Sequence, residues 1–250
     1  MNSILAGRKM SMTISPGPDK DKIKALFNSI SPVYDFLNRF LSFGLDHVWR
    51  KRLIHGIDLQ ADEKILDAAC GTGALSGLLL KRYPDMPFQL TGIDLSPEML
   101  HIASLRIRDI RTQFREGDLE ALPFEDETFH HVMVAFGVRN LENLVLGIQE
   151  MYRVLKKEGR LYILEFSVPP KGLWHTVFRF YFHNVLPRIG KKVSRHPGAY
   201  AYLPDSVDRF PSHNSFEQLL QNCGFTVFDT ISMTGGVCRL YRAKKELKGV

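Results

Sequence analysis

The sequence predicts an α/β fold, built on a mostly parallel sheet that ends in an antiparallel hairpin. The chain has 250 residues, of which 44% are hydrophobic, enough for one large domain with a substantial core. Short strand-like runs alternate with longer helical stretches, which is typical of parallel strands joined by right-handed crossovers. The last two runs are joined only by the turn residues MTGG, so they predict a hairpin. The seven expected strands lie at residues 64–69, 88–94, 112–117, 131–137, 159–167, 225–232 and 236–243.

Two further segments precede and interrupt this sheet. Residues 1–19 lack apolar periodicity and end in SPGPDK, which predicts a flexible arm. Residues 20–57 carry apolar residues at helical spacing and predict helices ahead of the first strand. We therefore expect residues 20–250 to form a single domain, in which residues 168–214 are an insertion after the fifth strand. Insertions at strand ends commonly build substrate sites.

Charge and cysteine content restrict the class of protein only partly. The formal net charge of +6 permits contact with nucleic acid, anionic lipid or an acidic substrate without selecting among them. Cys70, Cys223 and Cys238 are far apart and lack the spacing of a zinc site or a disulfide framework, so we expect no metal and a reducing cytoplasmic location. No run reaches the roughly 18 apolar residues of a membrane-spanning helix. We expect a soluble protein or one attached to a membrane surface.

A glycine turn follows the first predicted strand. Gly71, Thr72 and Gly73 come directly after KILDAAC, and Asp94 closes the second strand. The glycines let backbone amides approach a ligand at a helix N-terminus, and a carboxylate about 20 residues further on is placed to accept both ribose hydroxyls of a nucleotide. The ends of these two strands therefore predict a nucleotide cofactor site.

Two residues favour S-adenosylmethionine over a dinucleotide. The third glycine of the dinucleotide fingerprint is replaced by Ser76. Asp67, beside the turn, would repel a pyrophosphate but suits a cofactor that carries an ammonium and a sulfonium. These observations predict a methyl-transfer enzyme.

The end of the third strand adds two candidate cofactor residues. Asp118 is placed to accept from the adenine amino group, and Leu119 to cover the ring. Each feature has an ordinary alternative, because the glycines also fit a simple turn and Asp94 also fits a helix cap ahead of SPEML. Their occurrence together and in order favours the cofactor site.

Several longer motifs carry a family resemblance. They are YDFLNRFLSFGLDHVW at 34–49, MYRVLKKEGRLYILEFS at 151–167, EALPF, FGVRN, YAYLPDSV and MTGGV. From about residue 23 to residue 242, the chain resembles the menaquinone and ubiquinone biosynthesis C-methyltransferases. The resemblance implies the Rossmann-like fold of class I methyltransferases, S-adenosylmethionine as cofactor, and a prenylated hydroquinone, naphthoquinol or benzoquinol, as substrate. Where the family often has a serine, this chain has Ala135, which implies a backbone contact to the cofactor there.

Methylation of a ring carbon requires loss of a proton from the adjacent hydroxyl. Ionising a phenol with a pKa near 10 at pH 7 costs about 4 kcal/mol. Arg139 is the best candidate to stabilise the phenolate or to orient a water that takes the proton, although a structural ion pair is the alternative. Tyr34 is expected to position the ring beside Asn38, and His47 is the candidate for proton transfer. For His47 a packing or capping role is the alternative.

The insertion and the charge leave other interpretations open. The segment LWHTVFRFYFHNVLPRIGKKVSR interleaves apolar and basic residues, which fits either a helix on a membrane surface or an amphipathic lid. Methylation of RNA or of another small molecule is an alternative function, but the N/D-P-P-Y turn of amino-methylating enzymes is missing after the fourth strand, so we expect no nucleic-acid partner. A catalytically idle partner in a quinone-synthesis complex is a third hypothesis. The sequence leaves open whether the chain forms a homo-oligomer.

Overall fold

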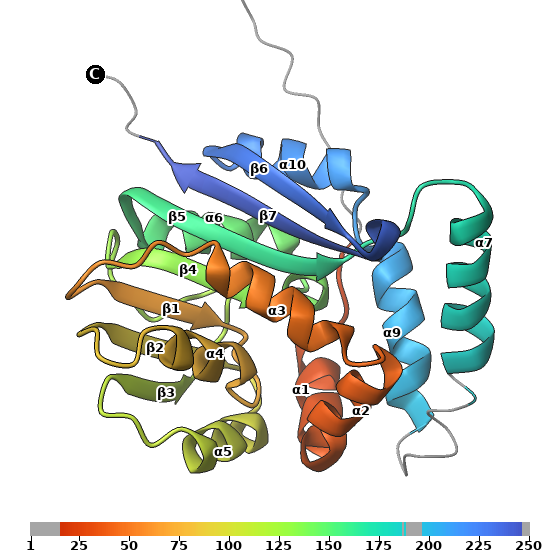
Figure 1. Ribbon diagram of the computed structural model, residues 1–250, viewed down its shortest axis with the longest axis horizontal. Helices are drawn as coiled ribbons and strands as arrows, with labels where there is room; N and C mark the ends of the chain where they lie inside the picture. The colour runs from red at the N-terminus through yellow and green to blue at the C-terminus, as the bar shows by residue number, and fades with distance from the viewer. Residues whose placement is uncertain (1–15, 187, 189–196, 247–250) are drawn as a thin grey trace, which may run out of the picture.

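The computed structural model describes residues 16–186, 188 and 197–246 (Figure 1). Most of the predicted arm, residues 1–15, lies outside the described residues. The end of that segment makes defined contacts: the Gly17 amide donates to the Glu142 carbonyl at 2.7 Å, and the Asp19 carboxylate caps the first helix by accepting from the Lys22 amide at 3.0 Å. At residues 16–19 the chain is therefore held against the body of the protein.

The seven predicted strands are present in the described residues and form one sheet. Its strand order is β3-β2-β1-β4-β5-β7-β6. Strands β1 to β5 pair in parallel, whereas β7 is antiparallel to both β5 and β6, so the prediction of a parallel sheet with a closing hairpin is confirmed. The strands are β1 Lys64–Ala68, β2 Gln89–Asp94, β3 Thr112–Glu116, β4 Phe129–Ala135, β5 Leu155–Phe166, β6 Phe225–Met233 and β7 Cys238–Lys245.

The helices fall into a preface, crossovers and the insertion. The preface of residues 20–57 is helical as predicted. The preface contains α1 Lys20–Ile30, η1 Ser31–Val33, α2 Tyr34–Leu41 and α3 Leu45–His55. The crossovers and turns contain α4 Ala74–Arg82, α5 Pro97–Arg106, η2 Val138–Asn140, α6 Leu144–Val154, α10 His213–Asn222 and η4 Thr234–Gly236. The insertion contains α7 Leu173–Phe180, η3 Tyr181–Val185 and α9 Pro197–Arg209.

Helices cover both faces of the sheet. Successive side chains of a strand point to opposite sides, so alternate residues of one strand pack against different helices. In β5, Tyr162 and Leu164 pack with α3 and α4, whereas Leu161 and Ile163 pack with α6 and α10. All four of these side chains are fully buried. A strand buried on both faces reads as a continuous apolar run, which is why RLYILEF predicts a strand.

The preface and the insertion meet at one edge of this sheet. Figure 1 shows α1, α2, α7 and α9 gathered beyond the carboxyl ends of β1, β4 and β5. In an open parallel sheet the ligand crevice lies beyond these ends. The fold therefore places two segments that are far apart in sequence beside the expected site.

Candidate active site

Three adjoining cavities lie at the carboxyl ends of the strands. The central cavity, of about 630 Å³, lies between α1 and the ends of β1, β2 and β4. The small cavity, of about 330 Å³, lies between α2 and the glycine turn, and shares Tyr34, Gly71 and Ala135 with the central cavity. The apolar cavity, of about 1080 Å³, lies among α2, α3 and the insertion, and shares Tyr34 and Phe136 with the central cavity. Tyr34 thus borders all three.

Asp94, the predicted ribose-binding residue, lies in the wall of the central cavity. Its carboxylate accepts from the Gly71 amide at 2.8 Å and from the Ser96 amide at 2.9 Å. Burial raises the pKa of Asp94, although these hydrogen bonds act in the opposite direction. The Ser96 hydroxyl, rather than Asp94, caps α5 by accepting from the Met99 amide at 3.2 Å. A carboxylate has about four acceptor positions, so Asp94 retains capacity for a ligand.

The two glycines of the turn have different roles. Both have a positive φ, +54° at Gly71 and +77° at Gly73. Gly71 lines the central and small cavities. Gly73 lines none of the three cavities; a Cβ there would lie 2.9 Å from the Ile107 side chain. Gly73 therefore permits close packing at the start of α4, and the structure does not place it with the expected cofactor contacts.

The small cavity gathers charged and polar side chains. The Asp67 carboxylate accepts from the Ser76 amide at 3.1 Å and from its hydroxyl at 2.5 Å, and burial raises the pKa of Asp67 to about 7. The Thr72 hydroxyl donates to Asp35 of α2 at 2.8 Å. Arg50 of α3 completes the wall. Two carboxyl groups and one guanidinium suit a group that carries both an ammonium and a carboxylate, such as an amino acid.

The end of β3 contributes Leu119 but not Asp118 to the central cavity. Leu119 is buried in the cavity wall. Asp118 forms an ion pair with Lys20 of α1 at 2.7 Å and is not among the lining residues. Asp118 and Leu119 lie in a tight turn after β3, in which the Ala121 amide donates to the Asp118 carbonyl at 3.1 Å, and the ion pair with Lys20 holds the Asp118 side chain outside the cavity lining. Ala135, at the end of β4, lines both the central and the small cavity.

Helix α1 covers the central cavity, a role that the sequence analysis missed. Ile23 and Phe27 line the cavity. The Ser96 hydroxyl donates to the Asn28 side chain at 2.6 Å, which joins α1 to the start of α5. The helical spacing of Ile23 and Phe27 predicts a packed face, but an apolar stripe does not distinguish a core from a cavity wall.

Arg139 combines the two roles that the sequence left open. Its Nη1 donates to the Glu165 carboxylate at 2.9 Å and to the Phe136 carbonyl, and its Nε donates to the Ser206 hydroxyl at 3.3 Å. The pair is buried, and burial raises the pKa of Glu165 while Arg139 opposes that shift. Arg139 also lines the apolar cavity, and among the described residues its Nη2 has no hydrogen-bond partner. Arg139 is therefore fixed in position with one nitrogen left for a ligand.

The preface supplies Tyr34 and Asn38 to the apolar cavity but not His47. On α3, Asp46 and Arg50 face the cavity, one helical turn apart. His47 follows Asp46 by one residue, about 100° around the helix, and does not line the three cavities. Burial, with a contribution from Lys51, lowers the pKa of His47. The structure thus does not bring His47 together with the other predicted catalytic residues.

Two further polar contacts were not expected from the sequence. Arg50 and Asp46 form a buried ion pair in the wall of the apolar cavity. The Tyr202 hydroxyl of α9 donates to the Asn140 side chain at 2.8 Å, and Asn140 lines the central cavity. The i, i+4 spacing of Asp46 and Arg50 is a usable signal of the ion pair, because such residues lie on one face of a helix.

Comparisons with known sequences agree on one family. Residues 17–245 match the sequence profile of the ubiE/COQ5 methyltransferase family. The chain is 41% identical over 230 residues to the demethylmenaquinone methyltransferase of Chlorobaculum tepidum, covering 90% of this chain and 93% of that protein. It is 38% identical over 229 residues to the ubiquinone/menaquinone biosynthesis C-methyltransferase UbiE of Citrifermentans bemidjiense, covering 90% of this chain and 97% of that protein.

Solved structures with the same fold are more distant in sequence. A SAM-dependent methyltransferase from Aquifex aeolicus superposes with a TM-score of 0.59 at 17% identity, covering 91% of this chain and 99% of that chain. The [4+2]-cyclase SpnF superposes with a TM-score of 0.70 at 16% identity, covering 94% of this chain and 98% of that chain. Since a cyclase and a methyltransferase both match, this likeness shows the fold alone.

Proposed function

The chain belongs to the ubiE/COQ5 methyltransferase family, and from this membership and the site geometry we propose that it methylates a ring carbon of a prenylated hydroquinone. The enzyme is a C-methyltransferase, and S-adenosylmethionine is the proposed methyl donor. The observation that carries the proposal is the contact between the central cavity, whose wall holds the Asp94 carboxylate, and the apolar cavity: the two share Tyr34 and Phe136. Two reactants, one in each cavity, can therefore meet at one point.

The residues of the central and small cavities fit S-adenosylmethionine. Asp94 would accept from the ribose hydroxyls, and Leu119 would cover the adenine. Asp67, Asp35 and Arg50 match an amino-acid moiety with its ammonium and carboxylate. When bound, the cofactor supplies an electrophilic methyl group on sulfur. Gly71 and Ala135 lie where the two cavities join, so one extended ligand can occupy both.

The apolar cavity fits the aromatic ring and the first part of an isoprenoid tail. Trp49, Phe166, Phe178 and Phe182 are among its lining residues. Apolar burial of this kind stabilises a bound hydrocarbon group by about 25 cal/mol per Å² of surface removed from water. The buried wall also excludes water, which strengthens any charge interaction inside it.

Arg139 is the proposed electrophilic residue. Its unoccupied Nη2 would donate to the quinol oxygen and hold the negative charge that develops as the proton leaves. Glu165 keeps the guanidinium charged and oriented, because the two groups compensate each other in a buried setting. Tyr34 would position the ring at the junction of the cavities. His47 lies outside the apolar cavity, so we do not propose it as the group that takes the proton.

The proposed pathway is the synthesis of menaquinone, ubiquinone or both. The named relatives act in these pathways, and their names include demethylmenaquinone as a substrate. Mass spectrometry of the quinones in cells that lack the protein tests this proposal. We expect a quinone lighter by one methyl group to accumulate and the mature quinone to be lost. Unchanged quinones together with undermethylated RNA would instead support the alternative function.

The location of the enzyme follows from the substrate. A prenylated quinol resides in a bilayer, so we propose a cytoplasmic enzyme that works at the membrane surface. Among the described residues, no helix has the length and hydrophobicity needed to cross a bilayer.

A further inference from the structure

An unusual group of large apolar side chains is exposed on the preface and the insertion. On α2 and the turn after it, Phe36, Phe40 and Phe43 are 61%, 49% and 78% exposed. On α7, Trp174, Val177 and Phe180 are 46%, 48% and 63% exposed. We call these six residues the apolar rim. Contiguous exposed apolar surface on this scale marks an interaction site rather than ordinary surface.

The apolar rim borders the apolar cavity on its solvent side. Phe43 contacts the Tyr181 ring, with centroids 5.8 Å apart, and so joins the two halves of the rim. Phe43, Trp174 and Val177 are exposed and also line the cavity. The same side chains therefore face both solvent and the proposed tail site. An elongated apolar ligand in the cavity can therefore contact these three rim side chains.

Helices α2 and α7, which carry the rim, and the neighbouring α3 together have a positive net charge. The segment LWHTVFRFYFHNV, residues 173–185, contains no acidic residue. Arg39, Lys51 and Arg52 are exposed on α2 and α3. The acidic residues on these two helices are occupied, since Asp35 pairs with Arg106 and Asp46 pairs with Arg50.

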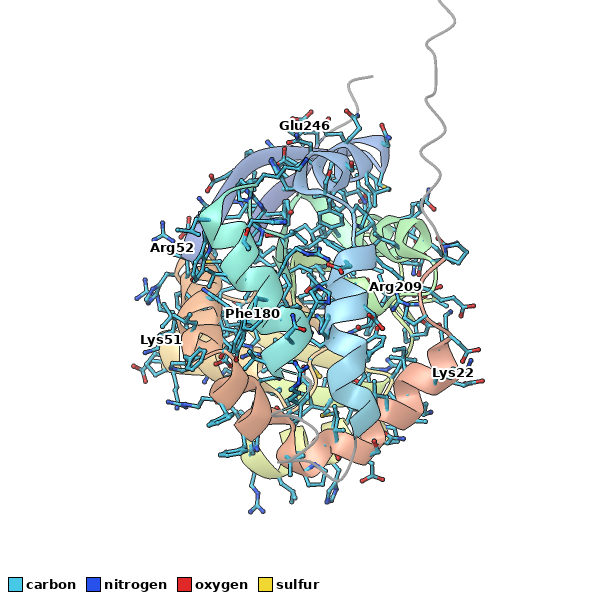
Figure 2. All side chains as sticks on the ribbon, turned by 90° about the vertical axis from the view of Figure 1, so that its right-hand side faces the viewer. Lys22, Lys51, Arg52, Phe180, Arg209 and Glu246 are labelled. Atoms are coloured by element: carbon cyan, nitrogen blue, oxygen red, sulfur yellow. The ribbon has the colours of Figure 1, made fainter. Side chains whose placement is uncertain are left out.

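The insertion contains one more acid that is held by basic side chains. Arg179 of α7 and His183 of η3 both contact Asp208 of α9, at 3.3 and 3.2 Å. Figure 2 shows Phe180 on the face turned toward the viewer, with Lys51 and Arg52 at the edge of the same face. An apolar patch flanked by cations is complementary to an anionic lipid surface, in which apolar groups enter the acyl boundary and cations meet the headgroups.

We propose that the apolar rim inserts into the surface of an anionic bilayer and that the substrate tail enters the apolar cavity directly from the lipid. The role of the tail rests on the proposed function; the binding of the rim to lipid does not. A second copy of this chain would also cover apolar surface, but the uncompensated cations of α2 and α3 would then face each other across a two-fold interface. Lipid headgroups neutralise these charges instead.

Flotation with lipid vesicles tests the proposal on the full chain. The wild-type protein is mixed with vesicles of phosphatidylcholine alone or with 30% phosphatidylglycerol, about the anionic content at which polybasic surfaces bind. We expect binding to the anionic vesicles that weakens with salt. The variant Phe36→Glu with Phe180→Glu is expected to reduce the partition coefficient at least tenfold, since each phenylalanine carries roughly tenfold or more of apolar binding. Neither residue lines the described cavities.

A matched variant controls for the added charge. Ile110 and Phe228 are 102% and 51% exposed and lie before β3 and on β6, the two edge strands of the sheet, outside the preface and the insertion. Ile110→Glu with Phe228→Glu adds the same two charges and should leave the partition coefficient within twofold of the wild type. Equal loss of binding in both double variants would overturn the assignment, because it would show a response to net charge alone. A melting temperature for each variant confirms that it is folded.

Turnover of two different quinols distinguishes a failure of the lipid-binding proposal from a failure of the proposed function. With a quinol that has a truncated, water-soluble tail, the rim variant should turn over within twofold of the wild type. With a long-tailed quinol in anionic vesicles, it should turn over at least fivefold more slowly. If the wild type methylates neither quinol but floats with vesicles, the proposed function fails and the lipid-binding rim stands. If the wild type is a dimer by analytical ultracentrifugation and the rim variant a monomer, the rim is a subunit interface and the inference is wrong.

Discussion

The two sides of the site are built in different ways. The central and small cavities are formed mainly by the loops that follow β1, β2 and β4, where Gly71 and Asp94 are joined through a backbone amide. The apolar cavity is formed by side chains of α2, α3, η2, β5 and the insertion, with two buried ion pairs in its wall. The first side depends on backbone conformation, and the second on packing between distant segments. Substitutions should therefore separate cofactor affinity from turnover.

Asp94→Ala should have the largest effect on the cofactor side. The substitution removes the carboxylate of the central cavity and the acceptor of the Gly71 amide. Because each hydrogen bond to a charged group contributes about 1.5–3 kcal/mol, we expect cofactor affinity to fall at least about 100-fold. Isothermal titration calorimetry with S-adenosylhomocysteine measures this change. Affinity within threefold of the wild type, in a variant with an unchanged circular dichroism spectrum, would contradict the assignment of Asp94.

Arg139→Ala should have the next largest effect, on turnover instead of cofactor affinity. Loss of a donor to a developing oxyanion typically lowers kcat by about 100- to 1000-fold. Cofactor affinity should stay within threefold, because Arg139 lines the apolar cavity and not the central one. Since the variant leaves Glu165 buried without its partner, Glu165→Gln with Arg139→Ala is the control for stability. Normal turnover in folded Arg139→Ala would rule out the proposed role.

Asp67 should make both stability and cofactor binding depend on pH. Burial raises its pKa from 3.8 to about 7, so between about pH 4 and pH 7 the folded state binds more protons than the unfolded state. Stability from this group is therefore full below pH 4 and is lost as the pH rises toward 7. Cofactor affinity should change the opposite way and rise from pH 6 to pH 8, because the ionised carboxylate is the form that attracts an ammonium.

Asp67→Asn should remove both effects. Melting temperatures at pH 5 and pH 7.5 should differ less in this variant than in the wild type, and calorimetry should give a flatter dependence of affinity on pH. Equal pH profiles in the two proteins would show that Asp67 titrates at its ordinary pKa.

Tyr202→Phe should have the smallest effect of these changes. It removes the hydrogen bond to Asn140 that joins α9 of the insertion to η2. A neutral hydrogen bond contributes about 0.5–1.5 kcal/mol, so kcat should fall about two- to tenfold. Tyr241→Phe is the matched control, because the buried Tyr241 hydroxyl has no hydrogen-bond partner among the described residues. Identical kinetics in the two variants would show that this link does not position η2.

The sequence predicts the sheet better than the strand boundaries. The apolar runs of β1 to β5 give a parallel sheet because strands buried on both faces leave a clear pattern. The fifth strand is expected to begin at residue 159, but α6 ends at Val154 and Leu155 already pairs with Phe129 of β4. Leu155 continues the apolar period of the helix, and only the partner strand determines that it is extended.

The site residues divide in the same way. Gly71 and Asp94 belong to a motif whose spacing fixes their geometry, so the sequence predicts them. The placement of Asp118 and His47 depends on which way a side chain points in the folded protein. Asp118 forms an ion pair with Lys20 of α1 and therefore does not line the central cavity. His47 lies on the side of α3 that faces away from the apolar cavity. Glu165 lies inside the motif MYRVLKKEGRLYILEFS, and a lone acid in an apolar strand does not reveal its partner.

The position of β7 has a consequence for how the molecule is assembled during synthesis. Strand β7 is the last strand in the chain, yet it lies between β5 and β6 in the sheet (Figure 1). Until it leaves the ribosome, the edge of β5 is unpaired and β6 has no neighbour to join. The turn before β7 carries Thr234 and Val237, which line the apolar cavity. A nascent chain can thus complete the half that holds the glycine turn and Asp94 early, while the wall of the apolar cavity closes only when translation has passed Lys245.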